Sequence, residues 1–408
     1  MVQITDSIEL PCGATLPNRL AKSAMSENMT QPKFFPGEEF IHAYNAWLKG
    51  QTGLLISGNV MVDSRFLGEP NNVVIEKGLD NFLHLKNWAK TAENFENHIW
   101  IQLNHPGKQT PKFLTPEPVA PSSIPLKAPL DKMFNTPREL TSSEILEIIN
   151  RFSYAAKIVK ESGFHGVQIH GAHGYLVSQF LSPLHNQRTD EWGGNLEKRM
   201  KFVVEIYKGI RKEVGEKFPI GIKLNSADFQ KGGFTQEESI LVAKTLSDLG
   251  IDLIELSGGS YESPVMTGVL QKESTLKREA YFLEFAKDIK NAISCPLMVT
   301  GGFRTKKFIE ESLEKNEVDI IGLGRALCID PNFSKKILEN QDITSEVKPL
   351  STGFKMLDKI FPLEIIWYTM QIHLLGKKKN PQPRASVYKA IWNSIKEIGF
   401  EGLKRVRS

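Results

Sequence analysis

Residues 219–259, PIGIKLNSADFQKGGFTQEESILVAKTLSDLGIDLIELSGG, contain the pattern that decides the fold. Two apolar runs rich in β-branched residues, 219–225 and 252–259, stand on either side of a helical segment. That segment opens with Thr235 and Glu238, which have the spacing of a helix capping box. Strands that are apolar almost throughout and are joined by a helix are typical of a parallel sheet buried on both faces. The stretch therefore predicts a βαβ unit.

The same kind of apolar run occurs eight times along the chain. The runs are residues 20–25, 53–62, 98–105, 166–171, 219–225, 252–259, 296–302 and 319–325. The intervals between them are long enough for helices, and Asn195 is a suitable N-cap for one that extends to Val214. Eight such units predict an α/β fold of the (β/α)8 TIM-barrel type. The alternative, an open doubly wound sheet, requires a G-x-G-x-x-G turn after its first strand, and the sequence has none there.

The chain has 408 residues, which exceeds the ~250 of a typical TIM barrel, so we expect additions to the fold. Residues 8–17 predict an N-terminal hairpin that plugs the amino-terminal end of the barrel. Residues 106–137 contain eight prolines, which predict an irregular excursion after the third strand.

The tail predicts a third addition. Helical patterns occupy residues 361–376 and 385–404, separated by a turn-like KKKNPQP. We therefore expect residues 1–345 to form the barrel and residues 346–408 to form a C-terminal helical extension packed on it.

Composition argues against several classes of protein. The chain is 40% hydrophobic and 24% charged, and its net charge of +4 is scattered, which argues against disorder and against nucleic-acid binding. Cys12, Cys295 and Cys328 lie too far apart for a disulfide framework or a thiolate metal site. The amino terminus lacks a secretory pattern and no run is long enough for a transmembrane segment, so we expect a cytoplasmic protein without a metal.

Polar residues and glycines gather at the ends of the predicted strands. These positions are Ser23–Ser26, Asn59, Gln102, His170–Tyr175, Lys223, Gly301–Gly302 and Gly324–Arg325. In a TIM barrel the functional residues project from the carboxyl ends of the strands. We therefore expect one site at that face.

Gly301, Gly302 and Gly324, with Arg325, follow the last two predicted strands and predict a phosphate site. Glycines let backbone N–H groups approach an anion, and arginine adds a charged pair of donors. The alternative is that these glycines only turn the chain. Glycine in both loops, together with an arginine, favours the phosphate site.

His170, His173 and Tyr175 follow the fourth predicted strand. The histidines could be metal ligands, core histidines or two N–H donors that converge on one oxygen. A metal is disfavoured because no carboxylate or thiolate neighbours them in sequence. As donors they would polarise a carbonyl group, and the Tyr175 phenol could supply a proton.

Residues 163–199, GFHGVQIHGAHGYLVSQFLSPLHNQRTDEWGGNLEKR, resemble the Old Yellow Enzyme family of FMN-dependent NAD(P)H:flavin oxidoreductases. Supporting runs occur in the family's order: LPNRLAKSAM, IQLNHPGKQ, IKLNSADFQKGGF, VTGGF and GLGRALCIDP. The resemblance covers residues 5–335, roughly, and each run falls on a predicted strand end. It implies a TIM barrel that binds FMN and takes hydride from NADH or NADPH.

The resemblance also implies roles for single residues. Gln102 would bond the pyrimidine edge of the flavin, Asn59 would lie near that side, and Lys223 would stabilise the charge of the reduced flavin. The other cofactor residues would be Ser23, Ala24, Met25 and Ser26 along the flavin, and Gly301, Gly302, Phe303, Gly324 and Arg325 at its phosphate. His170 and His173 match the pair that binds the substrate carbonyl, and Tyr175 matches the proton donor.

Three positions depart from the usual residues of the family. Lys223 stands where many relatives have arginine, Ser26 where they have threonine or cysteine, and Ala24 where proline is frequent. A serine hydroxyl can still donate to the flavin carbonyl, so we expect a functional enzyme with an altered reduction potential. The sequence lacks the cysteine cluster of the relatives that reduce dienoyl-CoA, so we do not expect it in that branch.

We therefore expect an ene-reductase, which reduces the C=C bond of an α,β-unsaturated carbonyl or related activated alkene by ping-pong hydride transfer. One alternative is an NAD(P)H:quinone or flavin reductase of the same family. A second is a flavin-free phosphate-binding aldolase or isomerase with Lys223 as a Schiff-base amine, and a third is a non-catalytic scaffold. The expected partner is a small-molecule alkene or quinone, and the protein is expected to be a monomer or a homodimer.

Overall fold

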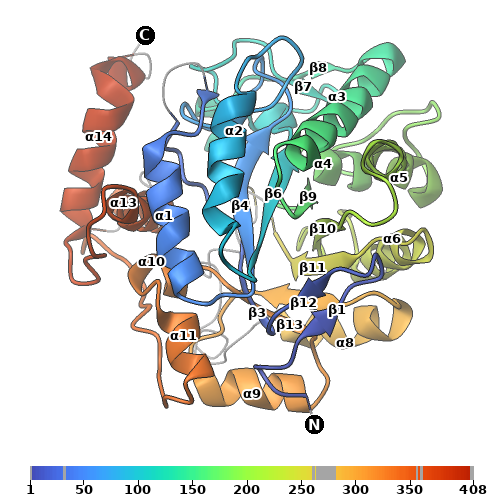
Figure 1. Cartoon of the computed structure of the whole chain (residues 1–408). Coiled ribbons are helices and arrows are strands. Elements are labelled where there is room, and N and C mark those ends of the chain that lie inside the picture. Colours follow the sequence, from blue (N-terminus) through green and yellow to red (C-terminus); the bar gives the residue numbers. More distant parts are fainter. Residues whose placement is uncertain are drawn as a thin grey trace.

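The computed structural model describes residues 2–30, 34–259, 262, 282–354, 357–358 and 362–404, with side chains as far as residue 396. Its centre is a closed barrel of eight parallel strands (Figure 1). The strands are β3 (Leu20–Lys22), β4 (Leu54–Met61), β6 (His98–Asn104), β9 (Gly166–Gly171), β10 (Ile220–Asn225), β11 (Leu253–Ser257), β12 (Leu297–Thr300) and β13 (Ile320–Leu323). Each pairs with its neighbour in chain order, and the pairing of β13 with β3 closes the ring.

All eight strands lie within the predicted runs, so the predicted TIM barrel is confirmed. The first run is longer in the prediction than in the structure, because residues 23–25 leave the sheet after β3. Ser23 still donates its N–H to the Leu323 oxygen at 2.9 Å, and the chain then reaches β4, where Glu27 accepts from the Gly58 N–H. The two-residue strand β5 (Val73–Val74) adds to the end of β4.

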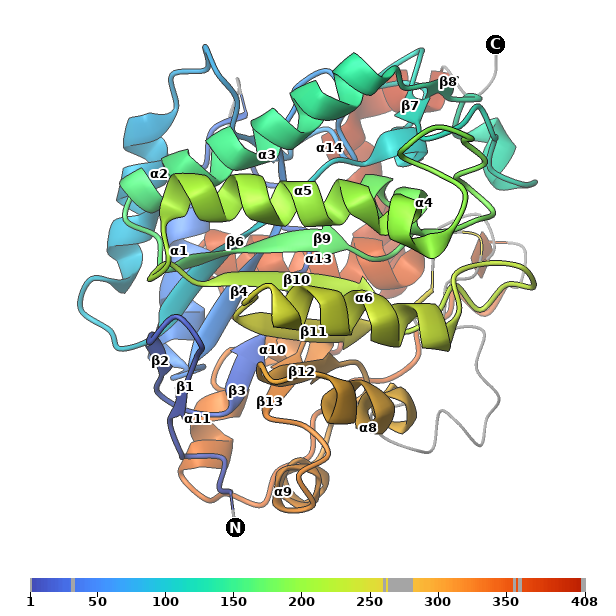
Figure 2. The same ribbon diagram turned by 90° about the vertical axis from the view of Figure 1, so that its right-hand side faces the viewer.

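Helices cover the outside of the barrel (Figure 2). They are α1 (Glu38–Lys49), α2 (Phe82–Ala89), α3 (Ser142–Glu161), α4 (Leu176–Leu181), α5 (Leu196–Val214), α6 (Gln236–Asp248), α8 (Leu283–Ala292), α9 (Lys306–Glu314), α10 (Arg325–Ile329) and α11 (Phe333–Leu338). Two predicted caps are confirmed. Asn195 accepts from the Lys198 N–H at 3.0 Å, and Thr235 with Glu238 forms the capping box of α6.

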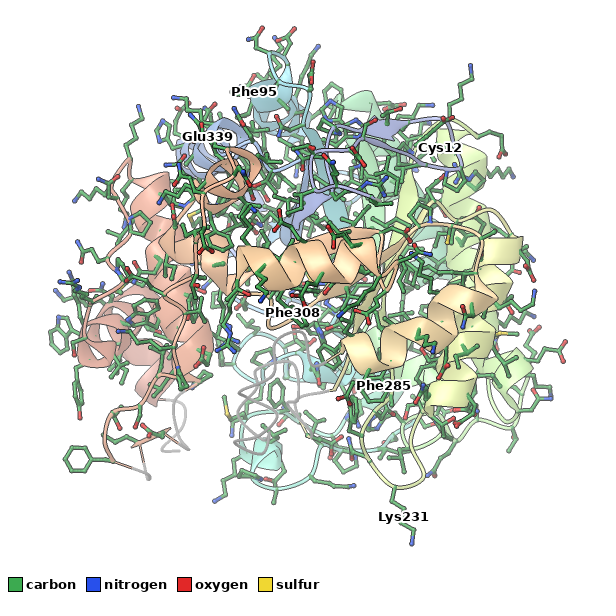
Figure 3. The ribbon with its side chains drawn as sticks, turned by 90° about the horizontal axis from the view of Figure 1, so that it is seen from below. Cys12, Phe95, Lys231, Phe285, Phe308 and Glu339 are labelled. Carbon is green, nitrogen blue, oxygen red and sulfur yellow. The ribbon has the colours of Figure 1, made fainter. Side chains whose placement is uncertain are left out.

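The predicted N-terminal hairpin is present as β1 (Ile8–Glu9) and β2 (Thr15–Leu16), paired antiparallel. Leu10 and Leu16 are buried against apolar side chains from the amino-terminal halves of the barrel strands, such as Leu54 and Trp100. Figure 3 places Cys12, in the hairpin turn, at one end of the molecule, and Lys231, in the loop after β10, at the other. The hairpin therefore plugs the end opposite the predicted site.

The segment from 106 to 137 is largely irregular, as predicted. It contains two short 3₁₀ turns, Gly107–Gln109 and Leu130–Lys132, and the strand β7 (Val119–Ala120), which pairs with β8 (Arg138–Glu139). The excursion follows β6 and so begins at the carboxyl-terminal face of the barrel.

The tail contains the two predicted helices, α13 (Leu363–Gly376) and α14 (Val387–Lys404), which lie together beside α1 (Figure 1). The His373 Nε2 atom lies 2.8 Å from the Glu27 backbone oxygen, and His42 Nδ1 lies 3.0 Å from the Gly376 oxygen. These contacts join α13 to the loop after β3 and to α1. Among the described residues, no helix combines the length and apolar character needed to cross a bilayer.

Leu16→Ala is expected to destabilise the protein by about 2–5 kcal/mol, because it opens a cavity in a fully buried cluster beneath the barrel. The free energy of unfolding from urea denaturation measures the effect. Thr15→Ala, at an exposed position of the same short strand, is the control and should change stability little. Equal stability of the two variants would mean that the hairpin does not support the barrel.

Candidate active site at the carboxyl-terminal face

Glu255 of β11 is a fully buried carboxylate inside the barrel. Its Oε1 atom lies 3.1 Å from Lys223 Nζ and accepts from Thr300 Oγ1 at 2.6 Å. Its Oε2 atom accepts from Gln168 Nε2 at 2.7 Å. A buried charge is stable only when it is paired and hydrogen-bonded, and these three partners from β10, β12 and β9 meet that requirement.

The network extends to two predicted cofactor residues. Gln102 Nε2 donates to Gln168 Oε1 at 2.7 Å. The single hydrogen of the Thr300 hydroxyl goes to Glu255, so at their 2.7 Å contact Ser23 donates to Thr300. A Cβ atom on Gly322 would lie 1.9 Å from Thr300 Oγ1, so the glycine of β13 leaves room for that contact.

The structure thus brings Ser23, Gln102 and Lys223 together through residues that the sequence analysis did not select: Gln168, Glu255 and Thr300. Glu255 had a readable signal, since it is the one charged residue within the apolar strand Leu253–Ser257. Which partners it meets depends on the closure of the barrel.

The loop after β3 lies against β4. Both carboxylate oxygens of Glu27 accept from the Gly58 N–H at 3.0 Å, and Tyr44 donates to Glu27 at 2.7 Å. Asn59, the next residue of β4, has a buried side-chain oxygen with no hydrogen-bond partner. In register, Asn59 pairs with Gln102, so these two predicted pyrimidine-side residues are neighbours.

His170, His173 and Tyr175 converge directly after β9. The His170 ring lies 5.1 Å from that of His173 and 4.8 Å from that of Tyr175, edge to face in both cases. His173 has φ of +63°, and its N–H donates to Asn225 Oδ1 at 3.1 Å. This uncommon backbone conformation turns His173 back beside His170.

Burial keeps both histidines neutral. Burial, the neighbouring His173 and the Lys223 cation hold the pKa of His170 well below its usual value. Burial and Lys223 lower the pKa of His173 to about 3. The His170 Nδ1 atom accepts from the Ala172 N–H at 3.3 Å, so the hydrogen of this neutral ring is on Nε2. His173 Nε2 lies 2.8 Å from Ser257 Oγ.

The loops after β12 and β13 contain the predicted phosphate residues. Gly301 and Gly302 have φ of +120° and +94°, which residues with a side chain rarely adopt, and Gly324 is the N-cap of α10. Arg325 Nη1 lies 3.1 Å from Glu364 of α13, and its guanidinium lies 5.9 Å from the Tyr368 ring. The tail therefore reaches the predicted phosphate arginine.

Phe303, Met25, Ala24 and Ser26 complete the predicted set. Phe303 is buried and packs near Phe308, and Met25 contacts Cys328 through sulfur at 3.2 Å. Ala24 is partly buried beside the apolar cluster under the barrel. Ser26 donates its hydroxyl to Glu69, on the loop after β4. No group of three or more His, Cys, Asp or Glu in the described part of the chain is arranged to hold a metal.

Comparison with known proteins agrees with this architecture. The model of the NADH:flavin oxidoreductase / NADH oxidase family matches residues 8–343, so the chain belongs to this family. It is an FMN-dependent oxidoreductase that uses a nicotinamide, NADH or NADPH, as hydride donor. The resemblance to the Old Yellow Enzyme family is thereby confirmed.

Two relatives with similar sequence identity differ in how much of their length this chain covers. The chain is 36% identical to the NADH-dependent flavin oxidoreductase iliE of Hypocrea jecorina over 363 residues, which cover 82% of this chain and 89% of that protein. It is 34% identical to the NADH oxidase of Thermoanaerobacter brockii over 329 residues, which cover 79% of this chain and 49% of that one. The chain thus spans about half the length of the second relative.

Solved structures share the fold. A 2-naphthoyl-CoA reductase complex superposes with a TM-score of 0.77 at 28% identity, covering 84% of this chain and 53% of that chain. Morphinone reductase superposes with a TM-score of 0.71 at 21% identity, covering 85% of this chain and 92% of that chain.

The residues present fit FMN. The orphaned Asn59 oxygen can accept a hydrogen bond from a buried ligand, and Gln102 lies beside it. Gly301 and Gly302 adopt backbone conformations open to an anion, and Arg325 and the start of α10 follow β13 in the neighbouring loop.

Glu255→Gln is expected to destabilise the protein by about 3–5 kcal/mol, because it leaves the Lys223 cation buried without its counter-charge. The free energy of unfolding of the FMN-free protein measures this. The double variant Glu255→Gln, Lys223→Met should be more stable than Glu255→Gln alone, since it removes the uncompensated charge. The single variant Lys223→Met completes the cycle, and losses in the two single variants that simply add up to the loss in the double variant would show that the pair is not coupled.

Proposed function

We propose that this oxidoreductase reduces the C=C bond of an alkene conjugated to a carbonyl or a related electron-withdrawing group. The observation that carries the proposal is the convergence of His170, His173 and Tyr175 at the end of β9. Two neutral imidazoles can donate to one carbonyl oxygen, and a phenol beside them can donate a proton. An aldolase or isomerase with Lys223 as a free amine is disfavoured because Lys223 is paired with Glu255.

The strand ends would hold FMN, which when bound accepts hydride from NAD(P)H and delivers it to the alkene. Gln102 and Asn59 would bind the pyrimidine side, and Lys223 would stabilise negative charge there. The other proposed cofactor residues are Ser23, Ala24, Met25 and Ser26 along the ring, and Gly301, Gly302, Phe303, Gly324 and Arg325 at the phosphate.

His170 and His173 would bind the substrate carbonyl. The low pKa of each ring means that both donate as neutral imidazoles throughout the physiological range. The hydrogen on His170 Nε2 is one donor. For His173, the Ser257 hydroxyl would donate to Nε2. The hydrogen of the neutral ring would then be on Nδ1, which would be able to donate. These donors stabilise the charge that develops on the carbonyl oxygen.

Tyr175 would donate a proton to the carbon next to the carbonyl group. It is 6% exposed and is the N-cap residue of the short helix α4, and its ring lies 4.8 Å from that of His170. A quinone accepts its protons on oxygen and does not need this donor. Activity toward quinones or free flavin is the second candidate function, and Tyr175 distinguishes it from alkene reduction.

We also propose that residues 346–408 act as an extension of a barrel formed by residues 1–345. Contacts of α13 with α1, with the Glu27 backbone and with Arg325 support this division. Residues 355–356, 359–361 and 405–408 of that range lie outside the described part of the chain.

Arg325→Ala is expected to weaken FMN binding by about 10- to 150-fold, because it removes a charge-assisted hydrogen bond worth about 1.5–3 kcal/mol. It also leaves Glu364 without this partner near the phosphate. Fluorescence titration of the FMN-free protein measures the dissociation constant. Lys307→Ala, at a side chain 84% exposed on α9, is the control. Wild-type affinity in Arg325→Ala would contradict the phosphate assignment.

Tyr175→Phe is expected to slow enone reduction by ~10²-fold while flavin reduction by NAD(P)H keeps its wild-type rate. The phenylalanine keeps the ring contact with His170 and removes the hydroxyl group that would donate the proton. Anaerobic stopped-flow absorbance follows the two half-reactions separately, and Tyr154→Phe on α3 is the control. If both half-reactions slow equally, the phenol is structural.

A further inference from the structure

Ser26 and Glu69 form a polar pair that the proposed function leaves unexplained. Ser26 lies on the loop after β3, and Glu69 lies on the loop after β4, 43 residues away in sequence. The Ser26 hydroxyl donates to the Glu69 carboxylate. Both side chains are partly buried at the carboxyl-terminal end of the barrel.

A serine hydroxyl has one hydrogen to donate. While that hydrogen is directed at an ionised Glu69, Ser26 can present only lone pairs to any other neighbour. A protonated Glu69 can instead donate its own hydrogen to Ser26 Oγ. The Ser26 hydrogen is then available to an acceptor on the other side. The charge state of Glu69 therefore decides whether Ser26 is a donor or an acceptor toward the site.

The surroundings of Glu69 disfavour its ionised form. Burial and the negative charge of Glu27 raise the pKa of Glu69 to about 7, against the opposing effects of Asn72 and His373. Glu27 is tied in place by Gly58 and Tyr44, so its charge stays near Glu69. The carboxyl consequently changes its protonation near neutral pH.

We propose that Glu69 is a positioning residue that sets the direction of the Ser26 hydroxyl, and through it the reduction potential of bound FMN. The inference rests on the proposed function, in which Ser26 lies beside the flavin. Protonated Glu69 frees the Ser26 hydrogen for a flavin acceptor, whose negative charge increases on reduction. Ionised Glu69 withdraws that hydrogen and adds a negative charge nearby. Both effects lower the potential when Glu69 ionises.

The direction of the pH effect follows from linkage. Reduction adds negative charge beside Glu69, so its pKa is higher in the reduced than in the oxidised holoenzyme. Below the lower of these pKa values Glu69 is neutral in both states and adds no pH dependence. Between the two pKa values, reduction draws in an additional proton, so the wild-type potential falls more steeply with rising pH. Above the higher value Glu69 is ionised in both states, so the excess slope ends and the wild-type potential stays below that of a protein without this charge.

The test measures the reduction potential of the FMN-loaded enzyme from pH 5.5 to 8.5 by equilibration with a reference dye, in wild type and Glu69→Gln. The glutamine amide can donate to Ser26 Oγ as protonated Glu69 would, and it cannot ionise. The two potentials should agree at low pH. At the highest pH the variant should favour the reduced form by at least tenfold, which is ~30 mV for a two-electron couple.

Two controls isolate the cause. Glu76→Gln alters a similar pair further along the same connection, where Ser64 Oγ donates to Glu76 Oε1 at 2.6 Å, and should leave the wild-type pH profile unchanged. Ser26→Ala keeps the Glu69 charge but removes the hydroxyl, and should lose most of the excess slope. An unchanged excess slope in Ser26→Ala would overturn the role of the hydroxyl, because charge alone would then explain it.

A readout independent of the potential follows the carboxyl itself. Infrared difference spectra of the holoenzyme between pH 5.5 and 8.5 should contain a protonated-carboxyl band that Glu69→Gln lacks. Identical pH profiles of potential in wild type and Glu69→Gln would overturn the inference. If such an enzyme still binds FMN and reduces enones, the proposed function survives. His373 also faces Glu69 and is retained in both proteins.

Discussion

The arrangement of the barrel mouth depends on the buried carboxylate of Glu255. Its charge is stable inside the barrel only because Lys223, Gln168 and Thr300 all bond to it. Each partner comes from a different strand, so satisfying one carboxylate fixes the relative positions of several strand ends. Ser23 and Gln102, two of the polar residues proposed to face the flavin, are the outer members of the same network, which holds them in place.

The Lys223 cation also acts on His170 and His173, the residues proposed to bind the substrate. Together with burial, its charge lowers the pKa of His170 and of His173, so both rings stay neutral and each has one N–H group to donate. The same ammonium group balances Glu255 and is proposed to stabilise negative charge on a bound flavin. One buried cation therefore serves the stability of the barrel and the electrostatics of the proposed site.

The tail contributes to the site from outside the barrel. Helix α13 contacts Arg325, the proposed phosphate arginine, through Glu364 and the loop after β3 through His373. That loop carries Ser26 and Glu27, so the tail constrains both ends of the proposed cofactor site. Residues beyond the barrel therefore contact a site proposed to be built from strand ends.

The sequence by itself determined the order and type of the elements, because the periodicity of apolar residues, the caps at Asn195 and Thr235 and the glycines after the last two strands are local signals. The motif-bearing residues were readable for the same reason. The pairings of Glu255 with Lys223 and of Ser26 with Glu69 were decided only by the tertiary structure. Those residues are far apart in sequence, and which side chains meet at a barrel mouth depends on strand register, ring closure and loop packing, none of which leaves a local pattern.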